Sequence, residues 1–388
     1  MSILFVSNGH GEASIADRIA EELRAIAPEM RLDHLALVGD AVSEHLEDVG
    51  PQRAMPSGGL IAMGNVRNIA RDVRSGLLAL TWAQVRFLRR RRKQYDVAVA
   101  VGDVYALIMA LLARRPTIFV GTAKSVYVAP YGPLEERVIA RAARRFVRDA
   151  ATAERLRASG LTVEPAANVI VDLFATADDP NAARAIAGFE PALALFPGSR
   201  ESAYGDAAFL LEVTQRLAGS QPSLGAVLSV SRGLDAAQFA GDAAARGWTV
   251  EMRDDAAIPF VLSKNGREIV RAWRGALGPV LGRVSLVLGQ AGTANEAAAA
   301  AGVGVVAFER DGDRQSSWYR KRQSGLLGDA LAVFPRENPA AAIGVDALLR
   351  DPQRRAQMGR AGRERMGEPG AARRIAEAIV ALAGKNAA

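Results

Sequence analysis

"VSLVLGQAGTANEAAAAAG", residues Val284–Gly302, places an apolar run, a glycine-rich turn and an alanine-rich run in immediate succession. The apolar run predicts a buried strand, and the alanine-rich run predicts a helix. Gly289 and Gly292 free the backbone of the turn to approach a ligand, and a helix start attracts anions. Thr293 can serve as the N-cap or donate to a phosphate, and Glu296 can cap the helix or bind the hydroxyl groups of a ribose. The residues alone leave these alternatives open.

The same alternation of strand and helix patterns extends outward from this stretch in both directions. It favours an α/β protein with two open, parallel sheets covered by helices. In the first half we predict strands at Ile3–Val6, His34–Val38, Val97–Val101, Thr117–Val120, Arg145–Val147 and Asn168–Val171. In the second half we predict strands at Ala192–Phe196, Gly225–Ser229, Thr249–Met252, Ser285–Leu288, Val303–Phe308 and Ala332–Phe334.

A polar stretch of small residues bounded by proline, 175–191, predicts a linker between two domains. The expected division is an N-terminal domain at 1–175, a C-terminal domain at 190–365 and a terminal helix at 366–388 that can pack back on the N-terminal domain. The length of 388 residues suits two domains of ordinary size. In open α/β sheets, ligands bind beyond the carboxyl ends of the strands, so the residues there are the candidates for function.

The amino-acid composition and net charge exclude some kinds of functional site and indicate others. The chain has no cysteine and three histidines, which excludes a thiol nucleophile and a thiolate metal site and disfavours zinc. A net charge of +7 indicates an anionic partner, such as a nucleic acid, a membrane surface or a phosphorylated substrate. No apolar run reaches the roughly 18 residues of a spanning helix, and no signal peptide pattern opens the chain. We therefore expect a cytoplasmic protein, soluble or peripheral on the inner face of the cell membrane.

Two further strand-end turns in the second half pair a serine with an arginine. "LALFPGSRES" carries Ser199 and Arg200, and "SVSRG" carries Ser231 and Arg232. A hydroxyl beside a guanidinium suits a phosphate, and two such turns with a glycine-rich helix start predict a diphosphate site. Gln315 follows the next strand and can reach the same site.

In the first half, "FVSNGHGEAS", Phe5–Ser14, joins a short strand to a helix expected at Ile15–Ile26. Gly9, Gly11 and Glu12 surround His10 in this turn, which is either a ligand-binding turn or a structural turn with a histidine placed by chance. Asp103 follows the strand Val97–Val101, where it is either a general base or the N-cap of a helix at Val104–Ala113.

Four segments together, "SNGHGE", "VGDVYALIMALLA", "ALALFPGSRES" and "VLGQAGTANEAAAAAGVGVVAF", resemble the lipid-A-disaccharide synthase-related proteins. That family is similar to lipid-A-disaccharide synthase and, more distantly, to the UDP-GlcNAc transferase of peptidoglycan synthesis. The resemblance implies a GT-B fold, with two Rossmann-like domains facing a central cleft. The nucleotide sugar is then expected mostly on the C-terminal domain and the acceptor on the N-terminal domain.

The resemblance also implies roles for single residues. Gly292, Thr293 and Glu296 would hold the diphosphate and ribose, and Ser199 and Arg200 would line the phosphate side. His10 or Asp103 would lie near the acceptor hydroxyl. The first turn departs from lipid-A-disaccharide synthase, which has an "AGE-ASGD"-like turn without the histidine.

The predicted activity is that of a metal-independent, inverting hexosyltransferase that moves a sugar from a UDP-sugar to a lipid-linked acceptor. It uses the UDP-sugar as co-substrate and no separate cofactor. The "DGD" at Asp311–Asp313 is the nearest match to a metal-binding motif and has no assigned role. A UDP-sugar 2-epimerase of the same fold is the alternative, and a basic nucleic-acid-binding module around Arg86–Gln94 is disfavoured because no recognition helix or aromatic platform accompanies it.

A helix expected at Leu77–Arg92 combines apolar side chains with a basic run. Two aromatic residues and five cations mark it as a candidate membrane-binding helix: Trp82, Phe87, Arg89, Arg90, Arg91, Arg92 and Lys93. The alternative is a core helix with a solvated basic end.

Overall fold

The computed structural model describes residues 1–38, 43–53, 76–174, 178–309 and 314–387. The "DGD" at Asp311–Asp313 and the start of the expected linker lie outside this part of the chain. Two compact units are present. Unit 1 contains Met1–Leu173 and Gly367–Ala388, and unit 2 contains Phe174–Met366.

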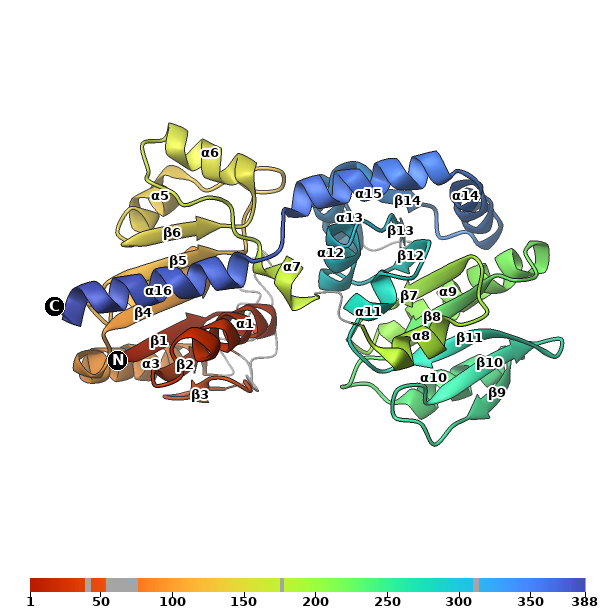
Figure 1. Cartoon of the computed structure of the whole chain (residues 1–388), viewed down its shortest axis with the longest axis horizontal. Coiled ribbons are helices and arrows are strands. Elements are labelled where there is room, and N and C mark those ends of the chain that lie inside the picture. Colours follow the sequence, from red (N-terminus) through yellow and green to blue (C-terminus); the bar gives the residue numbers. More distant parts are fainter. Residues whose placement is uncertain (39–42, 54–75, 175–177, 310–313, 388) are drawn as a thin grey trace. The chain divides into compact units, whose positions relative to one another are not determined.

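Unit 1 is built on a parallel six-stranded sheet with the order β3-β2-β1-β4-β5-β6 (Figure 1). Its central strands are fully buried apolar runs, as expected for a sheet covered on both faces. The strands are β1 (Ser2–Ser7), β2 (Arg31–Ala36), β3 (Glu47–Asp48), β4 (Val97–Gly102), β5 (Thr117–Gly121) and β6 (Arg144–Val147).

Helices connect these strands. They are α1 (His10–Ile26), α3 (Leu77–Arg91), the short 3-10 helix η2 (Arg92–Gln94), α4 (Val104–Leu111), α5 (Pro133–Ile139), α6 (Ala150–Ala158) and α7 (Val169–Leu173). The last helix of the chain, α16 (Ala371–Ala387), returns to unit 1 and packs against α1 and α7. The carboxylate of Asp172 accepts hydrogen bonds from the backbone N–H groups of Gly370 (2.6 Å) and Ala372 (2.7 Å), so α7 holds the start of α16.

Unit 2 contains an eight-stranded sheet with the order β14-β13-β12-β7-β8-β11-β10-β9. All strands are parallel except β10, which runs antiparallel to β9 and β11. The strands are β7 (Ala192–Phe196), β8 (Gly225–Ser229), β9 (Thr249–Met252), β10 (Phe260–Lys264), β11 (Arg267–Trp273), β12 (Leu286–Gly289), β13 (Val305–Phe308) and β14 (Leu331–Phe334). The helices are α8 (Pro180–Ile186), α9 (Ala203–Ser220), α10 (Ala236–Ala245), α11 (Gly278–Leu281), α12 (Thr293–Ala300), α13 (Arg314–Leu327), η3 (Gly328–Ala330), α14 (Asn338–Arg350) and α15 (Pro352–Met366).

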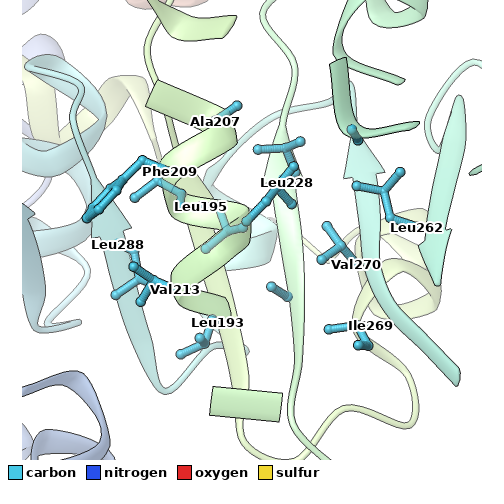
Figure 2. Packing of buried hydrophobic residues seen from close by; sticks show 14 of the residues in the cluster. Leu193, Leu195, Ala207, Phe209, Val213, Leu228, Leu262, Ile269, Val270 and Leu288 are labelled. Atoms are coloured by element: carbon cyan, nitrogen blue, oxygen red, sulfur yellow. The ribbon is translucent and has the colours of Figure 1, made fainter. Parts of the chain in front are cut away.

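Hydrophobic cores cover both faces of the unit 2 sheet, and the one with more residues lies between the sheet and the helices α9, α10 and α14. Figure 2 shows Phe209 and Val213 from α9 packed over side chains of the central strands, including Leu195 and Leu288. These strand residues are fully buried. Each large apolar side chain that is fully buried contributes about 1.5–3 kcal/mol relative to an exposed one, so this layer fixes the strands that carry the turns described below.

Three expectations need correction. Asn168–Val171 was expected to be a strand, but residues 169–173 form the single helical turn α7, because its side chains pack against α1 and α16 and leave no strand partner among the described residues. The expected linker contains α8, whose buried Ala182 and Ala185 pack onto unit 2. The turn after β1 is shorter than expected, because α1 already begins at His10.

Candidate functional site

The predicted phosphate turns of unit 2 follow three neighbouring strands. In the parallel register, Gly289 at the end of β12 lies opposite Phe196 at the end of β7, and Leu195 lies opposite Leu228 in β8. The turns after these strands therefore leave the same edge of the sheet. Ser199, Arg200, Ser231 and Arg232 all belong to these turns, and both arginines are exposed.

The glycine-rich turn after β12 needs its glycines for close approach. A Cβ atom on Gly289 would lie 1.8 Å from Oδ1 of Asn295, and one on Gly292 would lie 2.1 Å from the hydroxyl oxygen of Tyr319. Helix α12 begins at Thr293 with Gly292 as the N-cap, and no described side chain caps it. The expectation that Thr293 serves as the N-cap is therefore wrong, and this exposed threonine stands one position inside the helix.

Tyr319 joins this edge although the sequence analysis did not select it. Burial raises the pKa of the Tyr319 hydroxyl, the charge of Glu296 raises it further, and the charges of Arg320, Arg200 and Arg322 oppose the shift. Arg200 and Glu296 therefore act on the same hydroxyl, which places the two predicted donor-site residues around Gly292. Tyr319 and Gln315 both lie on α13, the helix after β13. The position of this helix was the sequence signal, and Gln315 was selected from it as a candidate site residue instead of Tyr319.

A buried network of hydrogen bonds holds the glycine-rich turn after β12 in place. The Nε2 group of Gln323 donates to the carbonyl oxygen of Ala291 (2.9 Å), and Nη1 of Arg320 donates to Oε1 of Gln323 (2.6 Å). Gln290 donates through Nε2 to the carbonyl oxygen of Phe308 (3.2 Å). Because these polar groups are buried and bonded, they hold the backbone of residues 290–292 in one conformation.

In unit 1, Asp103 stands at the end of β4 with both carboxylate oxygens engaged. Oδ1 accepts from the backbone N–H of Ala106 (2.9 Å), so Asp103 is the N-cap of α4. Oδ2 accepts from Nδ2 of Asn8 (2.9 Å), which follows β1. The N-cap alternative is correct, and the second bond ties this carboxylate to the turn after the first strand.

Glu12 lies beside this pair; the sequence analysis named it in the turn after the first strand but did not consider it as a group that transfers protons. Gly102 has a φ of 125°, and a Cβ atom there would lie 2.8 Å from Cγ of Glu12, so the glycine admits this side chain. Burial raises the pKa of Glu12 to about 7; a backbone hydrogen bond opposes the shift and the charge of Asp103 adds to it. The sequence analysis placed Glu12 with Gly9 and Gly11 in a turn that either binds a ligand or is structural, and two neighbouring carboxyl groups disfavour an anionic ligand there.

His10 is the first residue of α1, after Gly9 with its φ of 121°. Its side chain, like that of Gln315, lies outside the described part of the structure. Gly11 is exposed and would meet nothing within 4 Å if it carried a Cβ atom.

A hydrogen-bonded chain of Ser7, His34 and Asp48 crosses three strands of unit 1. His34 Nδ1 lies 2.9 Å from Oδ1 of Asp48, and Nε2 lies 2.8 Å from Oγ of Ser7. Burial lowers the pKa of His34, so the neutral ring donates to Asp48 and accepts from the hydroxyl of Ser7. Ser7 is fully buried, so the chain holds the end of β1 and does not present a nucleophile.

Helix α3 divides its side chains between core and solvent. Leu80, Gln84 and Leu88 are buried, and Trp82 is 67% exposed. Arg89, Arg90, Arg91 and Lys93 are exposed, and Arg92 is partly exposed in η2. Phe87 packs against the core of unit 1 with the guanidinium of Arg91 5.2 Å from its ring centroid, so it does not belong to the exposed face. No helix in the described ranges is long and apolar enough to cross a membrane.

Neither a scan against protein-family models nor a search of curated proteins found a match. Solved structures resemble the chain over nearly its whole length. A candidate UDP-N-acetylglucosamine 2-epimerase from Listeria monocytogenes is 15% identical with a TM-score of 0.63, covering 99% of this chain and 97% of that one. The UDP-GlcNAc 2-epimerase of Neisseria meningitidis, bound to UDP-GlcNAc, is 14% identical with a TM-score of 0.56, covering 98% and 100%.

A third similar structure is CalG4, the calicheamicin glycosyltransferase. It is 16% identical with a TM-score of 0.53, and the match covers 99% of this chain and 98% of that one. At such low identities the likeness concerns the fold. Two Rossmann-like units, each with an open and largely parallel sheet, and these neighbours together show that the chain has the two-domain α/β fold known as GT-B.

Proposed function

We propose that this protein is a metal-independent, inverting glycosyltransferase that moves a sugar from a UDP-sugar to a hydroxyl group of a lipid-linked acceptor. The observation that carries the proposal is the Glu12 carboxyl group, which has a pKa of about 7 and lies beside Asp103 at the end of β4. A general base works best when its pKa is near the operating pH. The motif resemblance to the lipid-A-disaccharide synthase-related proteins supports the acceptor class.

Unit 2 supplies the donor site in this proposal. Arg200 and Arg232 follow β7 and β8, and the start of α12 follows β12 at the same edge. Guanidinium groups and a helix start both stabilise negative charge, which develops on the diphosphate as it leaves. Glu296, in the first turn of α12, accepts the ribose hydroxyl groups. The neighbouring structures that contain UDP-GlcNAc or carry out glycosyl transfer support this assignment of the donor.

Unit 1 supplies the base. The carboxylate of Glu12 takes the proton of the acceptor hydroxyl, and the oxygen forms a bond to the anomeric carbon of the donor sugar. The bond between that carbon and the diphosphate oxygen breaks, and UDP leaves with its electron pair. Asp103, held by Asn8 and the start of α4, keeps negative charge next to Glu12. His10 and Asp103 remain the rival bases of the sequence analysis.

Calorimetric titration with UDP and an assay of UDP release from UDP-GlcNAc, with bacterial membrane lipid as acceptor, test the proposal. We expect UDP to bind, UDP release to need the lipid, and Glu12→Gln to lower turnover by about 10²–10⁴-fold. Glu21→Gln, an exposed position on the same helix, is the matched control. Normal turnover of a folded Glu12→Gln variant would remove Glu12 as the base, and absence of UDP binding would remove the donor assignment.

A UDP-sugar 2-epimerase is the second candidate, favoured by the two epimerase structures described above. A carboxyl group with a pKa near 7 can move the proton of a sugar carbon as well as that of a hydroxyl. Proton NMR of UDP-GlcNAc incubated with the protein alone separates the two activities. An epimerase inverts the configuration at C2 without any acceptor, whereas a transferase leaves C2 unchanged and releases UDP only when the acceptor is present.

We also propose that α3 attaches the protein to an anionic membrane surface. Leu78, Trp82, Arg86, Arg90 and Lys93 recur every three or four residues and are all exposed, so apolar and basic groups share one face. Each cation near an anionic surface contributes about 1 kcal/mol, and exposed Trp inserts at the interface.

Co-sedimentation with vesicles of phosphatidylglycerol and of phosphatidylcholine tests the attachment. We expect binding to the anionic vesicles that salt releases and that Arg89→Gln, Arg90→Gln and Lys93→Gln together abolish. A control variant removes three exposed charges elsewhere, through Arg137→Gln, Arg354→Gln and Arg360→Gln. Equal sedimentation of the two triple variants would show that α3 has no special part in binding.

A further inference from the structure

Four buried polar atoms in unit 1 have no hydrogen-bond partner among the described residues. They are Oδ1 of Asn8, Oγ1 of Thr122, Oη of Tyr131 and Oδ2 of Asp149. Asn8 follows β1, Thr122 follows β5, Asp149 follows β6 just past its end, and Tyr131 lies between β5 and α5. All of the unpartnered buried side-chain atoms found in the described part of this unit therefore belong to connections that leave the carboxyl edge of its sheet. Folded proteins leave few such atoms, so their concentration at one edge calls for an explanation.

The atoms gather around Asp103. A Cβ atom on Gly121 would lie 2.5 Å from the hydroxyl oxygen of Tyr131, and Gly121 pairs in the sheet with Gly102, the residue before Asp103. Burial raises the pKa of the Tyr131 hydroxyl, the charges of Glu135, Asp103 and Asp149 raise it further, and the charge of Arg148 opposes them. Asn8 is hydrogen-bonded to Asp103 itself. Thr122 is the residue after Gly121, and its carbonyl oxygen accepts from Nη1 of Arg148 (3.3 Å).

The hydrogen-bonding role of each atom is fixed by its neighbours. Asn8 has turned its Nδ2 group toward the carboxylate of Asp103, so its Oδ1 can only accept. Oδ1 of Asp149 accepts from the backbone N–H of Thr152 (2.8 Å), which leaves Oδ2 as a second acceptor. The hydroxyl groups of Thr122 and Tyr131 can donate. The side chains of Thr122, Tyr131 and Asp149 are only 9%, 2% and 7% exposed, so bulk water does not satisfy them.

This set of donors and acceptors selects for a neutral hydroxyl group. A phosphate offers only acceptors and would face the carboxylates of Asp103 and Asp149. An ammonium group offers only donors and would leave the hydroxyl hydrogens of Thr122 and Tyr131 without an acceptor. A hydroxyl group both donates and accepts, so one or two vicinal hydroxyl groups can bond Asp149 and Asn8 as donors while accepting from Tyr131 and Thr122.

We propose that Asn8, Thr122, Tyr131 and Asp149 form a recognition site for the hydroxyl groups of a neutral sugar, next to Asp103. The proposal rests on the proposed transferase function, because it names the class of acceptor that unit 1 takes: a glycosyl headgroup without charge at the recognised positions. A site built to bond a hydroxyl rejects analogues that lack it, since its own buried polar groups then stay unpaired. These side chains bind and orient the acceptor, and the proton transfer belongs to the carboxyl group beside them.

Tyr131→Phe separates this role from a structural one, because the two predict opposite changes in stability. If the hydroxyl lacks a partner in the resting protein, its removal relieves a desolvation cost, and the Tm of unit 1 should rise by about 2–4 °C. Saturation-transfer NMR with methyl β-D-glucopyranoside should detect millimolar binding to the wild type and at least a roughly tenfold loss in Tyr131→Phe. Tyr127→Phe, at an exposed tyrosine of the same connection, is the control and should leave glucoside binding unchanged.

A lower Tm for Tyr131→Phe would overturn the proposal, since it would show that the hydroxyl is already bonded in the resting protein. Unchanged glucoside binding, or no binding to the wild type, would overturn it as well. Thr122→Val gives the same test if Tyr131→Phe does not fold. As a control for ligand specificity, the phosphorus NMR signal of inorganic phosphate should show no line broadening that depends on Thr122 or Tyr131. A UDP titration on the same samples reports on the donor site in unit 2, so failure of the transferase proposal is seen separately.

Discussion

Unit 1 and unit 2 share the strand–turn–helix scheme, but different charges predominate at the carboxyl edges of their sheets: carboxyl groups in unit 1, beside the buried Arg148, and arginines in unit 2, beside Glu296. Glu12, Asp103 and Asp149 follow strands of unit 1 or open the helices behind them, whereas Arg200 and Arg232 follow strands of unit 2. The polar groups of unit 1 are mostly buried, and those of unit 2 are mostly exposed. The proposed function assigns two chemistries to one scaffold: removal of a proton at a partly desolvated site in unit 1, and binding of an anion from solvent in unit 2.

The units also differ in how they are completed along the chain. Unit 2 is one continuous segment, and unit 1 needs the terminal helix α16. Ala371, Ile375, Ala376 and Ile379 of this helix are fully buried in the described part of the structure. This difference predicts the largest effect of any single change.

Deletion of residues 367–388 should unfold unit 1 and leave unit 2 intact. Removing Ile375 and Ile379, both fully buried, the buried alanines beside them and the cap at Asp172 costs an amount comparable with the roughly 5–15 kcal/mol that stabilises an ordinary domain. Calorimetry should show one unfolding transition in place of two, with UDP affinity retained. Loss of UDP binding in the truncated protein would mean that unit 2 does not bind UDP independently of unit 1.

Glu12→Gln should stabilise the protein at alkaline pH while it removes activity. A carboxyl group whose pKa is raised from 4.5 to about 7 by folding stabilises the fold below pH 4.5, and this contribution is lost between pH 4.5 and 7. The neutral amide escapes that loss, so the variant should exceed the wild type by up to about 3 kcal/mol at pH 8 and by nothing at pH 4. Urea unfolding at the two pH values measures the difference.

The same group predicts the pH dependence of turnover. If the Glu12 carboxylate is the base, kcat/KM rises with pH and levels above about pH 7, because the carboxyl group must lose its proton first. Glu21→Gln should retain this limb of the profile. A kcat/KM that falls as the pH rises through 7 would instead assign Glu12 as a general acid. A kcat/KM that stays constant through pH 7 would show that Glu12 takes no part in proton transfer.

At the carboxyl edge of the unit 2 sheet, Arg200→Ala should weaken UDP binding by about 1–3 kcal/mol, the usual effect of losing a hydrogen bond to a charged group. Stability should change little, since the side chain is exposed. Arg216→Ala, an exposed arginine of α9, is the matched control in a calorimetric titration. Equal UDP affinities in the two variants would leave the turn after β7 without a part in anion binding.

The smallest effect concerns His34. Burial lowers its pKa, so the unfolded chain takes up a proton before the folded protein does as the pH falls below 6.5. The stability that His34 contributes is present above pH 6.5 and is lost on acidification, which is opposite in sign to the effect of Glu12. Proton NMR of the three histidines should show one ring that titrates well below the others, and Asp48→Asn should shift that ring alone.

Much of the fold could be predicted from the sequence, because its central strands are continuous apolar runs between helix patterns. Val97–Gly102 and Ala192–Phe196 are recognisable for this reason. The antiparallel pair β10 and β11 escaped prediction, because both strands mix apolar and charged residues. The helix α7 was taken for a strand, because Val169, Ile170 and Val171 favour strands until tertiary contacts decide otherwise.

The candidate site was predictable only where glycine marks it. Gly289 and Gly292 identified the turn of unit 2, whereas Tyr319 reaches that turn from a different helix. Glu12 was visible in the sequence, but its pKa is raised by burial, and that burial depends on Gly102, some ninety positions later, whose missing side chain leaves room for Glu12. Contacts between residues that lie far apart in the sequence, such as Glu12 and Gly102, produce no local sequence pattern from which they could be predicted.

The cap that Asp172 places on α16 has a consequence for biosynthesis. Asp172 emerges from the ribosome almost two hundred residues before the backbone groups that it binds. Unit 1, although it is translated first, must wait with the α16-facing sides of α1 and α7 uncovered until the last helix is released. Unit 2 has all of its sequence by Met366, so the second unit to be made is the first that can finish folding. A stop codon between Met366 and α16 would thus disrupt the unit that was synthesised earliest.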